Sequence, residues 1–294
     1  MNYVIKNLHY ALTVSDKGAE MVSLKRDTGA ELMWQCEDEE LWCDHAPLLF
    51  PVCGQLKGKG FYYKGVRYDM GGHGFIKNAI FTPVLTEESK LVLTTSSSEE
   101  TKKIYPFDFT LTATYELCDD KILFSVSVKN DGNEPLPHMF GWHPGFVLPT
   151  DSGCDIEDYA IRFRGDYEKL TWTPLQHGCF ARPYGEDYPI KDSKYILSED
   201  EIYKNDTMIF SDCGSSVELS AKDGGFKLNM SWSDNLPYLC VWKEPLNDAK
   251  FICLEPWTGT PNDGEVEEDF ETRKMERLLP GNEAVYSYEL SFEF

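Results

Sequence analysis

The sequence lacks several motifs that would place a chain of 294 residues in a familiar class of enzyme. There is no G-x-G-x-x-G or P-loop motif for a nucleotide, no G-x-S-x-G elbow for a serine hydrolase, and no C-x-x-C pair. No uninterrupted apolar stretch is long enough to predict a membrane span. These absences leave nucleotide chemistry, serine hydrolysis and a membrane-embedded function without support.

Basic residues are also scarce: 28 Lys and Arg stand against 50 Asp and Glu, which gives a formal net charge of −22. A surface this acidic repels nucleic-acid phosphates and anionic lipid headgroups, so we expect neither nucleic acid nor membrane among the partners. Aromatic residues, by contrast, make up 14% of the chain. They favour β-structure and, more loosely, a ligand with apolar faces and hydroxyl edges, such as a polyol.

The nine cysteines are scattered along the chain and odd in number. The opening residues 1–6 (MNYVIK) lack the basic stretch and apolar run of a signal peptide. We therefore expect reduced thiols in a cytoplasmic protein, most of them acting as small buried hydrophobes. His138 and His143 are five residues apart, which predicts opposite faces of a strand, so we expect no metal site from this pair.

A period of two dominates the hydrophobic pattern. Residues 109–117 and 119–130 alternate apolar and polar side chains and predict a β-hairpin. The same alternation recurs in residues 90–95, 216–220, 226–232 and 284–292. Helical signals are few, with one short turn predicted at residues 198–202, and the acidic residues 262–271 predict a solvated loop. The pattern therefore predicts an all-β protein with few short helices, folded as a single domain over residues 1–294.

Three short segments interrupt this pattern and concentrate unusual residues. In residues 71–75 (GGHGF), His73 is flanked by glycines, which allow a sharp turn and the close approach of a ligand. In residues 140–146 (FGWHPGF), His143 stands between Trp and Pro at the end of a strand, where a stiffly held ring suits a proton donor. An exposed turn histidine and a histidine packed in the core are the respective structural alternatives.

The third segment, residues 252–259 (ICLEPWTG), places Glu255 at the end of an apolar strand. Burying a carboxylate is costly unless it is functional or paired, so a salt-bridged structural Glu255 is the alternative. Two histidines and one glutamate are sufficient for general acid–base catalysis on a polyol. Glycoside hydrolysis normally uses two carboxylates and is less favoured, because only Glu255 stands out.

In these residues the sequence resembles the aldose 1-epimerase (galactose mutarotase-like) superfamily, and within it the LacX-like bacterial branch. The resemblance extends over nearly the whole chain, and four blocks in the same order carry it. After a first hairpin at residues 15–24 (SDKGAEMVSL), the blocks are residues 47–54 (PLLFPVCG), 70–75 (MGGHGF), 142–146 (WHPGF) and 254–259 (LEPWTG).

The resemblance implies a galactose mutarotase-like β-supersandwich that binds a free hexose and interconverts its α and β anomers. By position, Glu255 matches the general base that removes the C1 hydroxyl proton, and His143 matches the general acid that protonates the ring oxygen. His73 matches a second histidine that binds the sugar near the reacting centre, and Asp206 matches a sugar-binding aspartate. The resemblance implies neither a metal nor another cofactor, and we expect a monomer or homodimer.

Aromatic residues beside these positions complete the predicted site. We expect Phe75, Trp142 and Trp257 to cover the C–H face of the sugar while polar groups bind its hydroxyls.

The sequence departs from the family's pattern at two positions. Relatives usually carry an Arg after the residue that follows the Phe-Pro block, and Gln55 stands there instead. Gln55 hydrogen-bonds a hydroxyl but brings no positive charge, and Arg67 and Lys57 are the candidates to supply one. Gly72 replaces a bulkier residue before the histidine. Both changes alter the predicted substrate pocket.

Two alternative functions remain open at this point. A non-catalytic sugar-binding or sensing protein on the same fold is favoured by Gln55. A hexose-6-phosphate 1-epimerase would need a local basic pocket, for which Arg162, Arg164 and Arg182 are candidates. The net charge of −22 and the missing Arg argue against the phosphorylated substrate.

Overall fold

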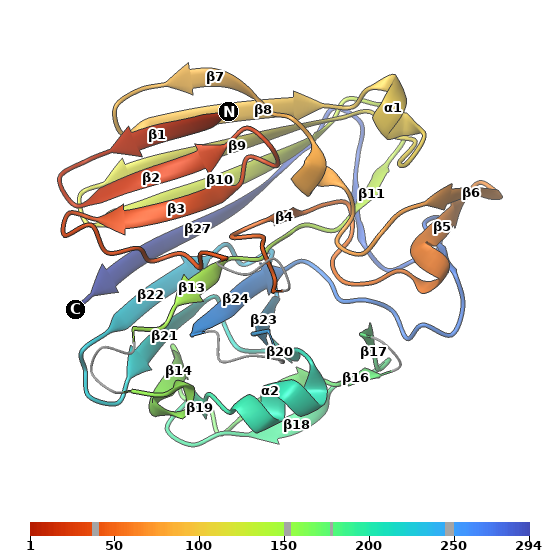
Figure 1. Cartoon of the computed structure of the whole chain (residues 1–294). Helices are drawn as coiled ribbons and strands as arrows, with labels where there is room; N and C mark the ends of the chain where they lie inside the picture. The colour runs from red at the N-terminus through yellow and green to blue at the C-terminus, as the bar shows by residue number, and fades with distance from the viewer. Residues whose placement is uncertain (37–40, 150–153, 177–178, 245–249) are drawn as a thin grey trace.

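The computed structural model describes residues 1–36, 41–149, 154–176, 179–244 and 250–294. Strands dominate this part of the chain, as predicted, and Figure 1 shows how they are arranged. Its two α-helices are α1 (Glu99–Lys102) and α2 (Glu199–Asn205), and its 3-10 turns are η1 (Lys57–Lys59), η2 (Ile76–Asn78) and η3 (Ile156–Asp158). The predicted helical turn is α2, whose N-cap Ser198 accepts a hydrogen bond from the backbone N–H of Glu201. No helix of the described residues is both long and apolar enough to cross a membrane.

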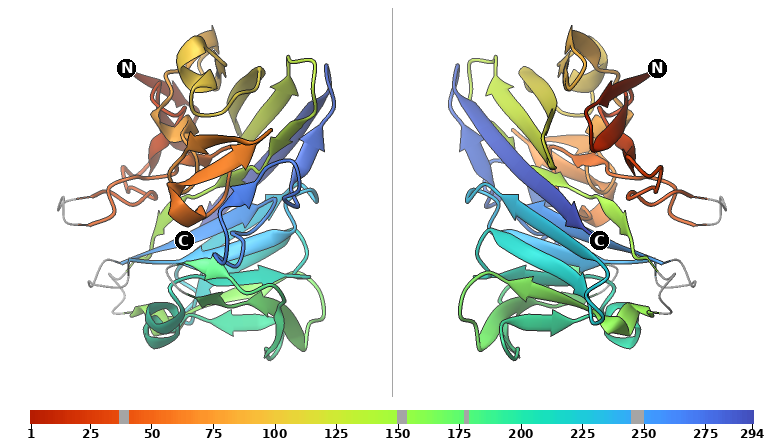
Figure 2. Two further views of the ribbon diagram at one scale, coloured as in Figure 1. Left: turned by 90° about the vertical axis from the view of Figure 1, so that its right-hand side faces the viewer. Right: turned by 90° about the vertical axis from the view of Figure 1, so that its left-hand side faces the viewer.

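The larger sheet has nine strands in the described part of the chain, and β27 lies at its centre. Figure 2 shows β27, in dark blue, crossing the molecule as one long strand. The spatial order is β19 (Lys194–Ile196), β14 (Tyr159–Phe163), β21 (Ser216–Ala221), β22 (Lys227–Trp232), β27 (Glu283–Glu293), β10 (Lys121–Asn130), β9 (Phe109–Cys118), β8 (Lys90–Ser96) and β7 (Thr82–Thr86).

The hairpin of β9 and β10 shows why these residues form strands. Alternate side chains of both strands are buried, and Cys118 pairs with Lys121 across a two-residue turn. Asp119 in this turn has φ +51°, a conformation that two-residue hairpin turns require and aspartate tolerates. Burying every second side chain fixes the register, because a slip by one residue would expose the whole apolar set.

The second large sheet provides the strands that hold the candidate catalytic residues. Its order is β18 (Glu186–Pro189), β15 (Lys169–Thr173), β20 (Met208–Ser211), β23 (Tyr238–Trp242), β24 (Phe251–Trp257), β12 (Gly141–Trp142) and β4 (Leu48–Leu49), and β13 (Gly145–Val147) also pairs with β24. Aromatic contacts join the two sheets: Trp142 packs on Phe124 and on Tyr288, each at a ring-centroid distance of 5.0 Å. The core therefore lies between two facing sheets, as a sandwich requires.

Strand β24 is buried along its entire length and has neighbours on both sides. On one side it pairs with β23, and on the other with β12 and then β13, which are separated by His143 and Pro144. Pro256 has no N–H to donate and would be unfavourable in the middle of an unbroken ladder. The gap between β12 and β13 interrupts the ladder on this side between Trp257 and Cys253, so no ladder hydrogen bond is required of Pro256 there. His143 lies in the same gap.

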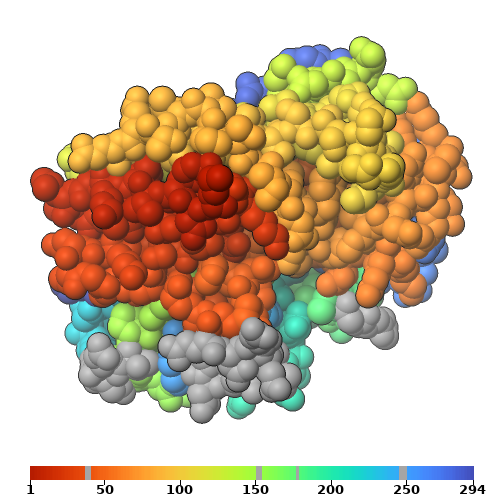
Figure 3. Space-filling model, turned by 45° about the horizontal axis from the view of Figure 1, so that its top comes forward, coloured from red at the N-terminus to blue at the C-terminus, as the bar shows by residue number. Residues whose placement is uncertain are grey.

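Four smaller sheets complete the described part of the fold. They are β1 (Asn2–Lys6), β2 (Tyr10–Ser15) and β3 (Met21–Arg26); β5 (Gly60–Tyr63), β6 (Val66–Asp69) and β25 (Glu268–Asp269); β11 (Leu136–His138) with β26 (Glu276–Leu278); and β16 (Leu175–Gln176) with β17 (Phe180–Ala181). The Tyr115 hydroxyl donates to the carbonyl of Ala19, which fastens the first of these sheets to β9. Figure 3 shows the N-terminal residues, in red and orange, gathered on one face.

The prediction of a solvated loop at residues 262–271 is wrong for its second half. Residues 268 and 269 form β25, which pairs in parallel with β5. Phe270 is fully buried and stacks on Phe61 at 3.7 Å, and the buried carboxylate of Glu268 forms an ion pair with Arg273. The acidic composition of this segment did not reveal that Phe270 is a core residue or that Glu268 is buried with Arg273 as its partner.

The cysteines divide into two groups. Cys36 and Cys43 form a disulfide with a Cα–Cα distance of 4.9 Å, so the prediction that all thiols are reduced is wrong for this pair. The other seven form no disulfide: those at positions 53, 154, 213, 240 and 253 are buried, as expected of small hydrophobes, and Cys118 and Cys179 are partly exposed.

The loop that carries His73 is attached to β4 by a very close backbone approach at Gly74. Gly74 has φ +75°, and a Cβ added there would lie 2.0 Å from the carbonyl oxygen of Phe50. Gly71, in the same loop, has ordinary backbone angles and open space around it.

We expect Gly74→Ala to lower the free energy of unfolding by about 1–3 kcal/mol, because strain and overpacking act together. Gly71→Ala is the matched control and should stay within about 0.5 kcal/mol of the parent protein. Urea unfolding followed by tryptophan fluorescence measures both, and equal midpoints for the two variants would contradict the role assigned to Gly74.

Candidate active site

A cavity of about 290 Å³ lies beside β24, and most of the predicted site residues line it. Its volume lies just below the range of about 300–1,000 Å³ found for small-molecule sites, which suits a ligand as small as a monosaccharide. Six of the eight predicted residues belong to its wall: Gln55, His73, His143, Asp206, Glu255 and Trp257. The other two, Phe75 and Trp142, do not.

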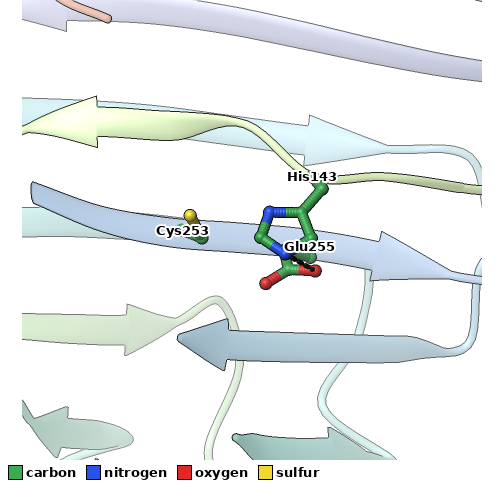
Figure 4. A group of neighbouring side chains, drawn as sticks. All are labelled: His143, Cys253 and Glu255. Carbon is green, nitrogen blue, oxygen red and sulfur yellow. Dashed lines mark ion pairs between the residues drawn. The ribbon is translucent and has the colours of Figure 1, made fainter. Parts of the chain in front are cut away.

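The pairing of β24 places His143 and Glu255 opposite each other. Gly141 pairs with Trp257 and Gly145 pairs with Cys253, so the residue halfway between the two glycines faces Glu255. Directly opposed residues in antiparallel strands have Cβ atoms about 4.5–5.5 Å apart. His143 Nε2 lies 3.3 Å from Glu255 Oε2, and Figure 4 shows the two side chains pointing toward one another.

Burial favours the uncharged form of both His143 and Glu255. The pKa of Glu255 is raised well above 4.5, mainly by burial and further by the charge of Asp206. The pKa of His143 is lowered well below 6.5, mainly by burial and further by His73. A carboxyl group and an imidazole this close titrate as a coupled pair, and their opposite shifts favour a state in which the pair holds a single proton.

His73 is held in one tautomer by the backbone. The N–H of Gly54 donates to His73 Nδ1 at 3.2 Å, and the N–H of His73 donates to the carbonyl of Gly54 at 2.8 Å. An Nδ1 that accepts a hydrogen bond carries no proton, so the neutral ring keeps its proton on Nε2. Burial lowers the pKa of His73 to about 4. At neutral pH His73 therefore offers a ligand one N–H donor and no charge.

The tryptophans around the cavity differ from the predicted set. Trp42 and Trp242 flank His143 at ring-centroid distances of 4.9 and 5.5 Å, and Trp257 lies 5.7 Å from His73. Trp142 is fully buried, and its indole N–H donates to the carbonyl of Ala46. Its predicted role in covering the sugar is wrong, because adjacent residues of an extended segment face opposite sides and His143 takes the side of the cavity.

Phe75 also packs into the core rather than the cavity. Its ring lies 6.3 Å from Phe50 and 6.2 Å from Tyr105, so its predicted place beside the sugar is wrong. Gln55 does line the cavity, and it lies against the backbone of Gly72, where an added Cβ would come within 2.6 Å of its amide. The two departures from the family's pattern are thus neighbours in space: Gly72 makes room for Gln55.

The cavity has a cation that sequence reasoning missed. Lys77 lines the wall and forms an ion pair with Asp44 at 2.7 Å, whereas Lys57 and Arg67 are not among the lining residues. Arg67 instead pairs with Glu267. Lys77 comes four residues after His73 on η2, but nothing in that spacing reveals its partner, which lies 33 residues earlier in the chain.

Asp206 lies in the wall at the end of α2, in a conformation with φ +65°. It accepts hydrogen bonds from the Thr207 hydroxyl at 3.1 Å and from the Cys179 thiol at 3.3 Å. Its side chain therefore lies where the resemblance predicts it, in the cavity wall, and its role in binding a sugar stays a prediction. The three candidates for a basic pocket, Arg162, Arg164 and Arg182, are not among the residues that line the cavity. Arg164 pairs with Glu218 and Arg182 with Glu186.

Three side chains of the site could also act as metal ligands. One donor atom each of His143, Cys253 and Glu255 lie within 4.8 Å of one another, and all three residues are buried. Figure 4 shows Cys253 and Glu255 on the same strand with His143 beside them. The sequence had indicated no metal site here.

Solved structures define the class to which this fold and site belong. A galactose mutarotase related enzyme from Lactobacillus acidophilus is 31% identical and superimposes with a TM-score of 0.92, covering 100% of this chain and 98% of its own. A galactose mutarotase-like protein from Lactobacillus casei ATCC 334, 24% identical, has the same fold, with a TM-score of 0.91 and full coverage of both chains. The protein thus has a galactose mutarotase-like fold, as predicted.

The family follows from the sequence itself. The model of the aldose 1-epimerase family matches residues 1–290, and the chain belongs to this family. The plasmid and chromosomal forms of protein LacX from Lactococcus lactis subsp. lactis are 26% and 27% identical over 306 aligned positions, which cover 99% of each chain. The resemblance stated from the four sequence blocks is confirmed.

The charges around His73 yield a test of the site's electrostatics. Lys77 lowers the pKa of His73 and Asp44 raises it, so removing each charge has an effect of opposite sign. We expect Lys77→Met to raise the pKa of His73 from about 4 and Asp44→Asn to lower it further. NMR titration of the imidazole signals measures these shifts. A His73 that titrates near its ordinary value in the parent protein, or shifts of equal sign in both variants, would contradict the described geometry.

Proposed function

We propose that the protein is a mutarotase that interconverts the α and β anomers of a free hexose by general acid–base catalysis. The single observation that carries the proposal is the pairing of His143 with Glu255, 3.3 Å apart, at the wall of a sugar-sized cavity. Membership of the aldose 1-epimerase family supports it. No other pair of titratable groups in the described cavity wall combines this proximity with such opposite shifts in pKa.

The reaction requires one proton to leave the sugar and another to arrive at a neighbouring oxygen. Glu255 as general base removes the proton of the C1 hydroxyl, the bond between C1 and the ring oxygen breaks, and His143 as general acid protonates that oxygen. Rotation about the C1–C2 bond turns the open-chain aldehyde over. Reclosure with the two roles exchanged forms the other anomer, so the sugar and the pair end with the protons they began with.

The buried pair is suited to this exchange because it needs one mobile proton and no net charge change. With one proton shared, the neutral form and the carboxylate–imidazolium form differ only by a proton transfer across the 3.3 Å between Oε2 and Nε2. The sugar, inserted beside the pair, takes a proton from one side and returns one to the other. His73 supports the same step as a neutral N–H donor to a sugar oxygen near C1.

The cavity wall favours an uncharged sugar over a sugar phosphate. Among the described residues of the wall there are three carboxyl groups, those of Asp44, Asp206 and Glu255, and one amine, that of Lys77, which Asp44 already neutralises. A phosphate placed among these groups would meet more negative charge than positive charge. Trp42, Trp242 and Trp257 offer apolar faces for the C–H bonds of a pyranose ring instead.

One specific observation favours a second function. Gln55 lines the cavity without a charge, so a protein that binds a sugar but does not turn it over is the competing proposal. Binding and turnover are separable by experiment. Calorimetry detects the bound sugar, and NMR exchange spectroscopy detects conversion between its anomers.

We expect Glu255→Gln and His143→Gln each to reduce the rate constant for anomer exchange by about 10²–10⁴-fold, because each removes a proton-transfer group. Polarimetry on fresh α-glucose and α-galactose measures the rate. Glu186→Gln, an exposed carboxylate outside the cavity, is the matched control and should retain the parent rate. Sugar binding with no acceleration over buffer in the parent protein would favour the non-catalytic alternative.

A second prediction concerns substrate class. Free hexoses should exceed the corresponding hexose 6-phosphates by at least about tenfold in kcat/KM, because like charges placed together in a cavity cost several kcal/mol. Coupled anomer-specific assays with each pair of substrates measure the ratio. A preference for the phosphorylated sugar would overturn the assignment to free sugars while leaving the acid–base pair in place.

A further inference from the structure

One buried nucleophile beside the active site has no part in the proposed reaction. Cys253 precedes Glu255 by two residues on β24, so both side chains point to the same face of the sheet. Its thiol is fully buried and does not line the cavity. The carboxylate of Glu255 thus has an imidazole opposite it and a thiol next to it along the strand (Figure 4).

The distances among these groups are close to those of a tetrahedral metal site. Zinc binds His nitrogen and carboxylate oxygen at about 2.0–2.2 Å, which sets the edge between two such ligands at about 3.3–3.6 Å. His143 Nε2 and Glu255 Oε2 are already 3.3 Å apart. The donor atoms of all three residues lie within 4.8 Å. With Zn–S bonds of about 2.3 Å, the edge from sulfur to each other donor is about 3.6 Å, so the thiol would need to move closer by at most about 1.2 Å.

The carboxylate is also unusually short of partners. Within the described residues, the buried Glu255 carboxyl group has His143 Nε2 3.3 Å from Oε2 but no well-formed hydrogen bond to either oxygen, and His143 Nδ1 is also buried without one. Lys77, the cavity's cation, is held by Asp44 instead. A buried carboxyl group in this state is satisfied by a proton, by a substrate hydroxyl or by a cation.

We propose that His143, Cys253 and Glu255 bind a thiophilic divalent cation of the zinc type, with the fourth coordination position open toward the cavity. The donor set of one nitrogen, one sulfur and one oxygen suits zinc, cadmium or cobalt and does not suit magnesium or calcium. The ion takes up both catalytic side chains and therefore excludes catalysis. Metal binding rests on the donor set alone, and the inhibition it causes rests on the proposed function.

Spectroscopy tests the binding without reference to activity. Titration of the purified protein with Co²⁺ and with Cd²⁺ should produce a thiolate-to-metal charge-transfer band. Cys253→Ala and Cys253→Ser should each lose the band, and Cys213→Ala, a buried free thiol on another segment, should keep it. Absence of the band in the parent protein overturns the proposal, as does its persistence in both Cys253 variants. Two different substitutions guard against the failure of one variant to fold.

Kinetics then tests the inhibition. Zn²⁺ should slow anomer exchange in competition with the sugar, and Mg²⁺ at the same concentration should have no effect. Cys253→Ala should keep the basal exchange rate but need more than about tenfold more Zn²⁺ for half-inhibition, since a lost ligand should weaken binding at least as much as a lost second-shell partner does. Equal inhibition of the parent and the variant would contradict the site. A charge-transfer band in a protein without mutarotase activity would sustain the metal site and refute only the proposed function.

Discussion

The antiparallel pairing of β24 with β12 and β13 is the constraint on which the candidate site depends. Their common register brings His143 opposite Glu255, and the break between the two short strands leaves the space in which the ring lies. The same break accommodates Pro256 in a fully buried strand. Both sheets of the sandwich hold this arrangement in place, because Trp142, next to His143, packs on Phe124 and Tyr288 of the opposite sheet.

Burial of Glu255 and His143 opposite each other determines their protonation behaviour. Desolvation raises the pKa of Glu255 and lowers that of His143, so each loses its preference for the charged form. In the proposed mechanism, the pair then exchanges one proton with a bound sugar at little cost in charge separation. The backbone of Gly54 makes His73 a neutral donor beside them. In the proposed mechanism, catalysis thus depends on the exclusion of solvent from the pair and on the strand register that brings the two side chains together.

Local pattern was sufficient to predict the fold class and to single out three residues that the structure brings together in the cavity wall. The alternation in residues 119–130 fixes a strand, and the blocks around His73, His143 and Glu255 carry the family resemblance. The errors arose where tertiary packing decides. Trp142 faces the core because its neighbour faces the cavity, and Lys77 meets Asp44 only in the folded chain. Cys36 and Cys43 likewise meet only in the folded chain.

The pH dependence of kcat/KM for anomer exchange tests the shared proton most directly. In the proposed mechanism the pair works only while it holds one proton, so kcat/KM should fall on both sides of a plateau. The acid limb, where a second proton binds, should lie below pH 6.5, because the pKa of His143 is lowered from that value. The alkaline limb, where the only proton leaves, should lie above pH 4.5, because the pKa of Glu255 is raised from that value. A rate with one limb alone, or with an acid limb above pH 6.5, would contradict the account.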